Sequence, residues 1–252
     1  MWRLLGNHTP ASALKRAISL VRGMGLARTL SMVMAAVDDK YVRSFDRRYR
    51  IKTSAYILLP NTSFAPSRLS DATQYGPVNG WALRKFLREI RLPRELHFVD
   101  LGCGLGRACI LAAEYGFKRV TGVELAPEFC ALARDNLARC RLPASSLSSV
   151  TIVQMDVLDF CEQTDADVFF MFRPFSEEFL SWVLQKLEAR AKGRNKPLTV
   201  ICSERMLVPM SYTRTVARHP DFRKTYEAGI LGQAFYVYEC GNSSSPLDPK
   251  AT

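Results

Sequence analysis

The stretch that decides the fold is Phe98-Val99-Asp100-Leu101-Gly102-Cys103-Gly104-Leu105-Gly106-Arg107. An apolar run leads into a glycine-rich turn, and a helical pattern begins directly after it. Glycines let the backbone make a tight turn and let a ligand approach closely. In a sheet of parallel strands, ligands bind outside the carboxyl ends of the strands. We therefore expect a buried strand, a ligand-binding loop and the start of a helix.

The spacing of the glycines favours one class of ligand. A dinucleotide loop has the pattern G-x-G-x-x-G, but position 107 is Arg and the third glycine is Gly106. Asp100 lies two residues before Gly102, and its carboxylate would repel a pyrophosphate. It suits a ligand that carries an ammonium and a sulfonium. The loop therefore favours S-adenosylmethionine (SAM), with its methionine half beside Asp100 and the loop glycines Gly102, Gly104 and Gly106.

Strand and helix patterns alternate after this loop. The expected strands are residues 97–101, 119–124, 150–154, 168–172 and 198–202, with helices at 106–115, 127–139 and 176–191. Such alternation implies an α/β fold with a mostly parallel sheet that is covered on both faces. Two further strand-like runs, 222–227 and 234–239, are separated by Gly229 and Gly232, which predicts a hairpin.

Two more acids follow expected strands. Glu124 ends the second strand 18 residues after Gly106, which is close to the usual spacing for an acid that binds both ribose hydroxyls. We expect Leu125 beside it in the same site, although an exposed strand-end Glu would read the same way. Asp156 follows the third strand, where it could accept from an adenine amino group while Val157 packs on the ring. An Asp there equally suits the N-cap of a helix.

This linked set of residues resembles the class I SAM-dependent methyltransferases over about two thirds of the chain. The resemblance implies a Rossmann-like, seven-stranded sheet whose last strand is antiparallel, in keeping with the expected hairpin. More narrowly, Phe98 to Ala113 and Gly122-Val123-Glu124-Leu125 are similar to a group of bacterial methyltransferase-like proteins. Those proteins also have segments similar to Asp46-Arg47-Arg48-Tyr49 and Tyr75-Gly76-Pro77. This similarity implies that Tyr75 lies near the methionine carboxylate.

The resemblance places the methyl acceptor beyond the fourth strand, at Asp167 to Phe175, where the sequence reads Phe170-Met171-Phe172-Arg173-Pro174-Phe175. Related proteins tend to have Asn-Pro-Phe there, and amine-methylating relatives have an Asn or Asp that accepts a hydrogen bond from the amine. Arg173 cannot accept a hydrogen bond or act as a base, which argues against amide-type and adenine-N6 methylation. It could bind an acidic group of the substrate, or pair with Glu177 or Glu178.

The neighbours of Arg173 complete the expected site. Phe172 is a candidate for the cofactor pocket, and Pro174 and Phe175 are candidates for substrate contact, although the aromatic rings could simply pack. Glu204, after the fifth strand, is the second catalytic candidate beside Arg173. An obvious base is not required, because alignment of an already activated methyl donor can supply most of the acceleration.

Composition narrows the class of protein. Seven Cys without C-x-x-C spacing and only three His argue against a disulfide framework and a zinc site. We therefore expect no metal, reduced thiols and a cytoplasmic location. The sequence contains no stretch of 18 uninterrupted apolar residues, so we expect no transmembrane helix.

Positive charge is concentrated at the beginning of the chain. Residues 1–52 hold eleven Lys and Arg against three Asp, or +8 of the net charge of +11. We expect a basic helical arm at 1–60, a methyltransferase domain at 61–241 and a disordered tail at 242–252. The arm could bind nucleic acid or an anionic membrane surface, or be a solvated basic face.

Three functions stay open from the sequence. The first is a SAM-dependent methyltransferase that acts on a small molecule or a protein amine. The second is an RNA methyltransferase anchored by the basic arm. The third is a non-catalytic SAM-binding protein, which Arg173 at the acceptor position keeps open.

Overall fold

The structure is a computed structural model that describes residues 43–54, 75–194, 196–206 and 212–241. All of these residues belong to one compact unit that begins at Tyr41. The expected arm helices before residue 43, the boundary at residue 60 and the tail from residue 242 lie outside the described residues.

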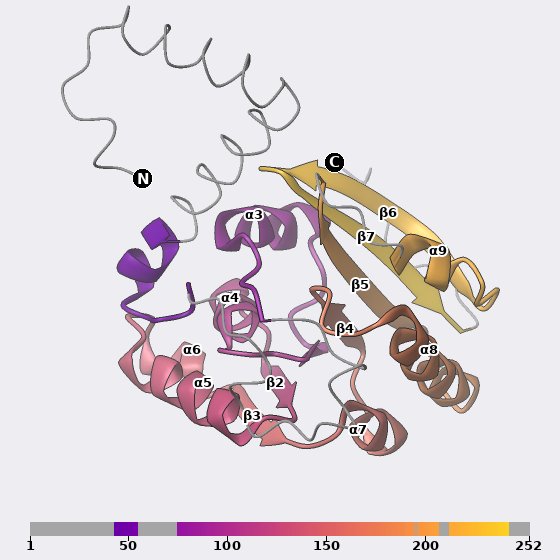
Figure 1. Cartoon of the computed structure of the whole chain (residues 1–252), viewed down its shortest axis with the longest axis horizontal. Helices are drawn as coiled ribbons and strands as arrows, with labels where there is room; N and C mark the ends of the chain where they lie inside the picture. Colours follow the sequence, from indigo (N-terminus) through magenta and orange to yellow (C-terminus); the bar gives the residue numbers. More distant parts are fainter. Residues whose placement is uncertain (1–42, 55–74, 195, 207–211, 242–252) are drawn as a thin grey trace, which may run out of the picture. The chain divides into compact units, whose positions relative to one another are not determined.

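Seven strands form one sheet in the order β3-β2-β1-β4-β5-β7-β6 (Figure 1). They are β1 (His97–Leu101), β2 (Arg119–Glu124), β3 (Val150–Gln154), β4 (Val168–Met171), β5 (Leu198–Arg205), β6 (Phe222–Ile230) and β7 (Gln233–Cys240). The first five strands pair in parallel, whereas β7 is antiparallel to both β5 and β6. The α/β fold predicted from the sequence, with its antiparallel C-terminal hairpin, is confirmed.

Helices cover both faces of this sheet (Figure 1). They are α3 (Gly80–Ile90), α4 (Arg107–Tyr115), α5 (Pro127–Arg139), α6 (Ala144–Leu147), α7 (Val157–Gln163), α8 (Glu177–Lys192) and α9 (Tyr212–Val216). Alternate strand residues face opposite ways, as the pleat of a strand requires. Phe98 and Phe170 join the core under α3 and α4, while Val99 and Phe169 join the core under α7 and α8. Burial on both faces explains the continuous apolar runs in the sequence.

Most predicted boundaries hold to within a few residues. The largest differences are at the C-terminal strands, where β5 extends to Arg205 instead of ending at residue 202. Its antiparallel pairing with β7 continues as far as Arg205 opposite Gln233. The cross-strand partner therefore lengthens both strands beyond what the local pattern predicts.

Residues 43–54, which the sequence assigned to the arm, pack into the core of the domain. Residues 43–49 are helical, and Phe45, Tyr49 and Ile51 are buried in the cluster that contains α3 and α4. The Phe45 ring lies so close to Gly80 that a Cβ there would come within 2.5 Å of it. The boundary at residue 60 stays a prediction. Among the described residues, no helix has both the length and the apolar character needed to span a bilayer.

Candidate active site

The fold brings the glycine-rich loop to a reversal of strand order. The chain places β2 and β3 on one side of β1 and then returns to place β4 on the other side. The loops that follow β1 and β4 touch there, because a Cβ on Gly102 would lie 2.4 Å from Pro174. In open parallel sheets, such a reversal at the carboxyl ends of the strands is the usual place for a ligand.

The glycines of the loop adopt backbone conformations that other residues rarely accept. Gly102, Gly104 and Gly106 have φ values of 73°, 51° and 82°. The amides of Gly102 and Cys103 both donate to the carbonyl of Val123, at 2.9 and 3.0 Å. The turn predicted from the glycine spacing is therefore present, and it is tied to the end of β2.

Asp100 and Glu124 bury their carboxylates at the carboxyl ends of adjacent strands. Their residues are 4% and 7% exposed, and within the described part of the chain no ion pair engages either one. The pKa of Asp100 is raised to about 7, mainly by burial and also by the charge of Glu124, against the lowering effect of a hydrogen bond from the Cys109 thiol. Two buried acids without a cation form a site of negative potential. Such a site suits a cationic ligand.

Glu124 also organises the loop. Its Oε2 accepts from the Gly104 amide at 2.9 Å, and its Oε1 accepts from the amides of Leu125 and Ala126 at 2.9 and 3.0 Å. Burial raises the pKa of Glu124, while these three amide donors lower it. The carboxylate thus joins the glycine loop to the end of β2, at the place where the sequence predicts ribose binding.

Tyr75 lies directly against the glycine loop. A Cβ on Gly104 would come within 2.4 Å of its ring, and its hydroxyl donates to the carbonyl of Thr53 at 2.9 Å. Its ring also contacts Phe129, with centroids 5.5 Å apart. The structure therefore brings Tyr75 to the loop predicted to hold the methionine half, and its contact with a ligand stays a prediction.

Asp156 and Val157 mark the start of α7. The Asp156 side chain accepts from the Leu158 amide at 2.8 Å, so it is the N-cap of that helix. Val157 is buried. The structure thus shows the N-cap role that the sequence offered as an alternative for Asp156. The adenine contact stays a prediction.

Arg107 connects the loop to the segment before the domain, which the sequence did not predict. Its guanidinium is 2% exposed and pairs with Asp46 at 2.9 Å. It also donates to Thr53 Oγ1 at 2.7 Å and to the Val78 carbonyl at 2.8 Å. The sequence features that could have indicated this contact are an Arg in place of the third glycine and the Asp46-Arg47-Arg48-Tyr49 segment. The two are far apart in the sequence, and no local pattern predicts that they pair.

Arg173 follows β4 and has a left-handed backbone, with φ of 49°. Burial lowers its pKa, while the negative charge of Glu204 raises it. Glu204 is 4% exposed near the end of β5, so the structure brings the two catalytic candidates together. Glu177 and Glu178, the alternative partners, are exposed in the first turn of α8, where negative charge stabilises the helix.

The loop after β4 is held by Tyr212, a residue that the sequence analysis missed. Its buried hydroxyl accepts from the Phe175 amide at 2.8 Å and donates to the Phe175 carbonyl at 2.7 Å. Phe175 itself is buried against Phe179, whereas Phe172 is partly exposed. Phe175, a candidate for substrate contact, thus packs in the core, and the cofactor contact of Phe172 stays a prediction.

Metal-ligating residues do not gather in this site. Across the described ranges, no three His, Cys, Asp or Glu side chains come together as a metal centre requires. All seven cysteines are free thiols, and six of them are buried. Cys103 and Cys109 fill the space above Gly122, where a Cβ would lie 2.8 Å from each sulfur. These thiols are packing groups.

Comparison with known proteins gives a family-model match and several structural likenesses. Residues 98–192 match the model of a methyltransferase domain. No curated protein matches the chain. A putative RNA methyltransferase from Pyrococcus horikoshii is similar in structure, with a TM-score of 0.55 and 14% identity, over 82% of this chain and 98% of that one.

Two further solved structures share the fold. One is an RNA methyltransferase from Salinibacter ruber in complex with S-adenosyl-L-homocysteine, with a TM-score of 0.50, 18% identity, and coverage of 68% of this chain and 99% of that one. The other is the pyocyanin biosynthetic protein PhzM, with a TM-score of 0.52, 17% identity, and coverage of 64% and 54%. At these identities the likeness is one of fold.

Proposed function

We propose that this chain, whose residues 98–192 match the model of a methyltransferase domain, is a class I SAM-dependent methyltransferase. We further propose that it methylates an acceptor at the carboxyl ends of β4 and β5. One observation carries the proposal. Asp100 and Glu124 are buried on adjacent strands beside a loop of left-handed glycines, and among the described residues neither forms an ion pair with a cation.

The proposed cofactor site consists of residues from the first three strand ends and the loop that packs on them. They are Tyr75, Asp100, Gly102, Gly104, Gly106, Glu124, Leu125, Asp156, Val157 and Phe172. SAM, when bound, supplies a methyl group that is already activated on a cationic sulfur. Asp100 would attract the cationic methionine half. Glu124, already oriented by three backbone amides, would accept from the ribose hydroxyls.

The proposed acceptor site lies at Arg173, Pro174 and Glu204, next to Phe175, whose side chain packs in the core. Arg173 offers a cation for an acidic group of the substrate. Glu204 is the neighbouring acid whose charge acts on it, and it could accept a hydrogen bond from an amine or hydroxyl nucleophile. An acceptor that carries both an acidic group and a nucleophile, as a small molecule or a protein amine, fits this pair.

Calorimetry tests the cofactor site. We expect wild-type protein to bind SAM and S-adenosyl-L-homocysteine and not NAD, and Asp100→Ala to lose most of the affinity for both. Asp165→Ala is the matched control, because this acid is 70% exposed and pairs with Arg119 at the amino ends of the strands, away from the proposed site. SAM binding by Asp100→Ala that equals wild-type binding would reject the site.

The acceptor needs a separate experiment. Transfer of radiolabelled methyl from SAM to fractionated extract, followed by nuclease or protease digestion, separates the acceptor classes. An RNA acceptor is the second candidate, because the described segment 43–52 exposes five cations. Tight SAM binding without transfer to any fraction would instead favour a non-catalytic SAM-binding protein. The buried free thiols support the proposed cytoplasmic location, because they suit a reducing compartment.

A further inference from the structure

The segment Asp46-Arg47-Arg48-Tyr49 divides into residues that face inward and residues that face outward. Asp46 pairs with Arg107, and the Tyr49 hydroxyl donates to Glu114 at 2.8 Å. Arg47 and Arg48 are exposed. The inward pair fastens the segment to α4, so the two outward arginines sit on a fixed support.

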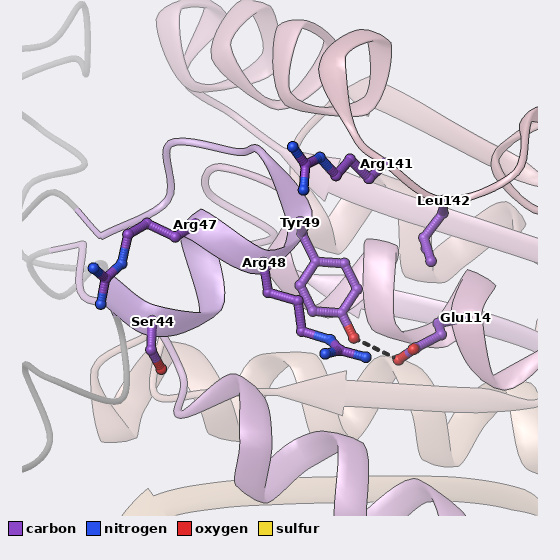
Figure 2. Close-up of a pocket in the computed structure, with 7 residues that line it drawn as sticks. All are labelled: Ser44, Arg47, Arg48, Tyr49, Glu114, Arg141 and Leu142. Carbon is purple, nitrogen blue, oxygen red and sulfur yellow. Dashed lines mark hydrogen bonds between the residues drawn. The ribbon is translucent and has the colours of Figure 1, made fainter.

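Arg47 and Arg48 line a surface pocket of about 630 Å³. Figure 2 shows the guanidinium of Arg141 directed toward the same space from the end of α5. The lining residues are Ser44, Arg47, Arg48, Tyr49, Glu114, Arg141 and Leu142. Two separate parts of the chain thus contribute arginines to the lining of one pocket, and Figure 2 shows the Arg47 guanidinium directed away from those of Arg48 and Arg141.

The pocket has a net positive charge. Its single acid, Glu114, is already neutralised by a bidentate contact with Arg84, at 2.8 and 3.0 Å, and by the Tyr49 hydroxyl. In the described part of the chain, no ion pair engages Arg47, Arg48 or Arg141. The guanidinium of Arg48 also lies 5.6 Å from the centre of the Trp81 ring, which restricts its motion.

We propose that the pocket lined by Arg47, Arg48 and Arg141 binds the phosphate backbone of RNA. A planar guanidinium makes paired hydrogen bonds to phosphate oxygens, and three arginines line this pocket, which suits contacts to successive phosphates. The site is distinct from the methyl-transfer edge. Glu114 is seven residues along α4 from Arg107, or about 10 Å at 1.5 Å per residue. Binding at this pocket does not require methyl transfer, so the inference goes beyond the proposed function.

The surroundings of the pocket favour a nucleic acid over a membrane. Exposed cations continue along the same segment at Arg43, Arg50 and Lys52, as needed for a chain of successive phosphates. A membrane-binding surface combines cations with exposed apolar side chains. The large exposed hydrophobic residues of the described part lie elsewhere, at Leu132, Trp182, Met206 and Leu231.

Fluorescence anisotropy with a short labelled oligouridine tests the proposal, using the full chain without SAM. We expect Arg47→Ala/Arg48→Ala/Arg141→Ala to bind about tenfold more weakly or worse at low salt. Its slope of log K against log salt should fall by about 2, since each phosphate contact on a single strand contributes about 0.7. The charge-matched control is Lys196→Ala/Arg214→Ala/Arg218→Ala, whose exposed cations lie near β5 and α9, and it should retain most of the affinity.

Circular dichroism and SAM calorimetry on both triple variants establish that the fold and the cofactor site are intact. Oligouridine binding by the pocket variant with wild-type affinity and salt slope overturns the proposal. Equal loss in the control variant overturns it too, because the effect would then be one of net charge. If only the binding of phosphatidylserine vesicles depends on the three arginines, the ligand is a membrane and the RNA assignment is wrong.

Discussion

Asp100 lies in an environment that is costly for a negative charge. A carboxyl group at the end of a buried strand loses its hydration, and burial raises the pKa of Asp100 to about 7, above the ordinary 3.8. Between these two values the folded state retains a proton that the unfolded chain has released. The free energy of unfolding therefore falls as the pH rises from about 4 to about 7. A bound cation would remove this penalty.

Asp100→Asn separates stability from ligand binding. We expect the free energy of unfolding of the variant, relative to that of wild type, to be larger at about pH 8 than at about pH 5. The difference should be on the order of 1–3 kcal/mol, because the variant has no charge to bury. It should also lose SAM affinity, whereas wild-type affinity should rise with pH as Asp100 ionises. Urea unfolding and calorimetry at both pH values measure these effects. A stability difference that is the same at both pH values would contradict the account.

Glu124→Gln tests the second acid without changing its size. Both carboxylate oxygens of Glu124 accept from backbone amides, but a Gln has one acceptor oxygen and would place its NH2 group against an N–H. We expect a loss of about 1–3 kcal/mol in stability and weaker SAM binding, measured by urea unfolding and calorimetry. A variant that binds SAM as tightly as wild type would exclude Glu124 from the cofactor site.

At the scale of elements, residues 46–54 fasten the start of α4. Asp46 accepts from the Thr53 and Ser54 amides at 2.7 and 2.8 Å and pairs with the buried Arg107. Arg107 is also the first residue of α4, directly after the glycine loop. The segment before the domain therefore helps to position the glycine loop.

A double-mutant cycle measures this connection. Asp46→Ala leaves the Arg107 guanidinium buried without its acid and should cost about 3–5 kcal/mol in urea unfolding. Asp46→Ala/Arg107→Met should cost less than the sum of the two single variants, because no buried charge is left unpaired. Glu89→Ala, at an exposed ion pair with Lys85, serves as the control and should stay close to wild type. Additive single effects would mean that the two residues do not act as a pair.

The contact between α9 and the loop after β4 gives a second prediction at this scale. Tyr212→Phe leaves both the amide and the carbonyl of Phe175 without their buried partner. We expect a loss of about 1–3 kcal/mol in stability, with SAM affinity nearly unchanged, since the loop belongs to the acceptor side. Equal loss of SAM affinity and stability would place Tyr212 in the cofactor site instead.

At the scale of the whole molecule, ligand binding is linked to stability through the sheet. The proposed site is made from the ends of β1, β2, β3 and β4, and these strands exist only in the folded chain. A ligand that binds the folded state alone at 100 times its Kd adds about 2.7 kcal/mol. We expect SAM and S-adenosyl-L-homocysteine to raise the Tm in a thermal-shift assay and NAD to leave it unchanged. A shift with NAD would indicate a dinucleotide site.

Much of the fold, and the placement of Asp100 and Glu124 beside the glycine loop, could be predicted from the sequence, because their signals are local. The positions of β1, β2 and β3 follow from apolar runs bounded by turns, and the loop follows from its glycine spacing. Because neighbouring parallel strands have their carboxyl ends on the same side of the sheet, they then bring Asp100 and Glu124 to that side. The local pattern and the sheet geometry are therefore sufficient to place the two acids and the glycine loop.

Only the tertiary structure decided the contacts between distant segments. Asp46 lies 61 residues from Arg107, and Tyr212 lies 37 residues from Phe175. The charge of Glu204, in β5, acts on Arg173, which follows the neighbouring strand β4. No periodicity encodes such pairs, because they depend on which helix faces pack together and how far each side chain reaches. The chain alone thus determined its strands and its likeness to a SAM-binding fold, while packing determined the contacts of Arg107 with Asp46 and of Tyr212 with Phe175, and the arginine pocket.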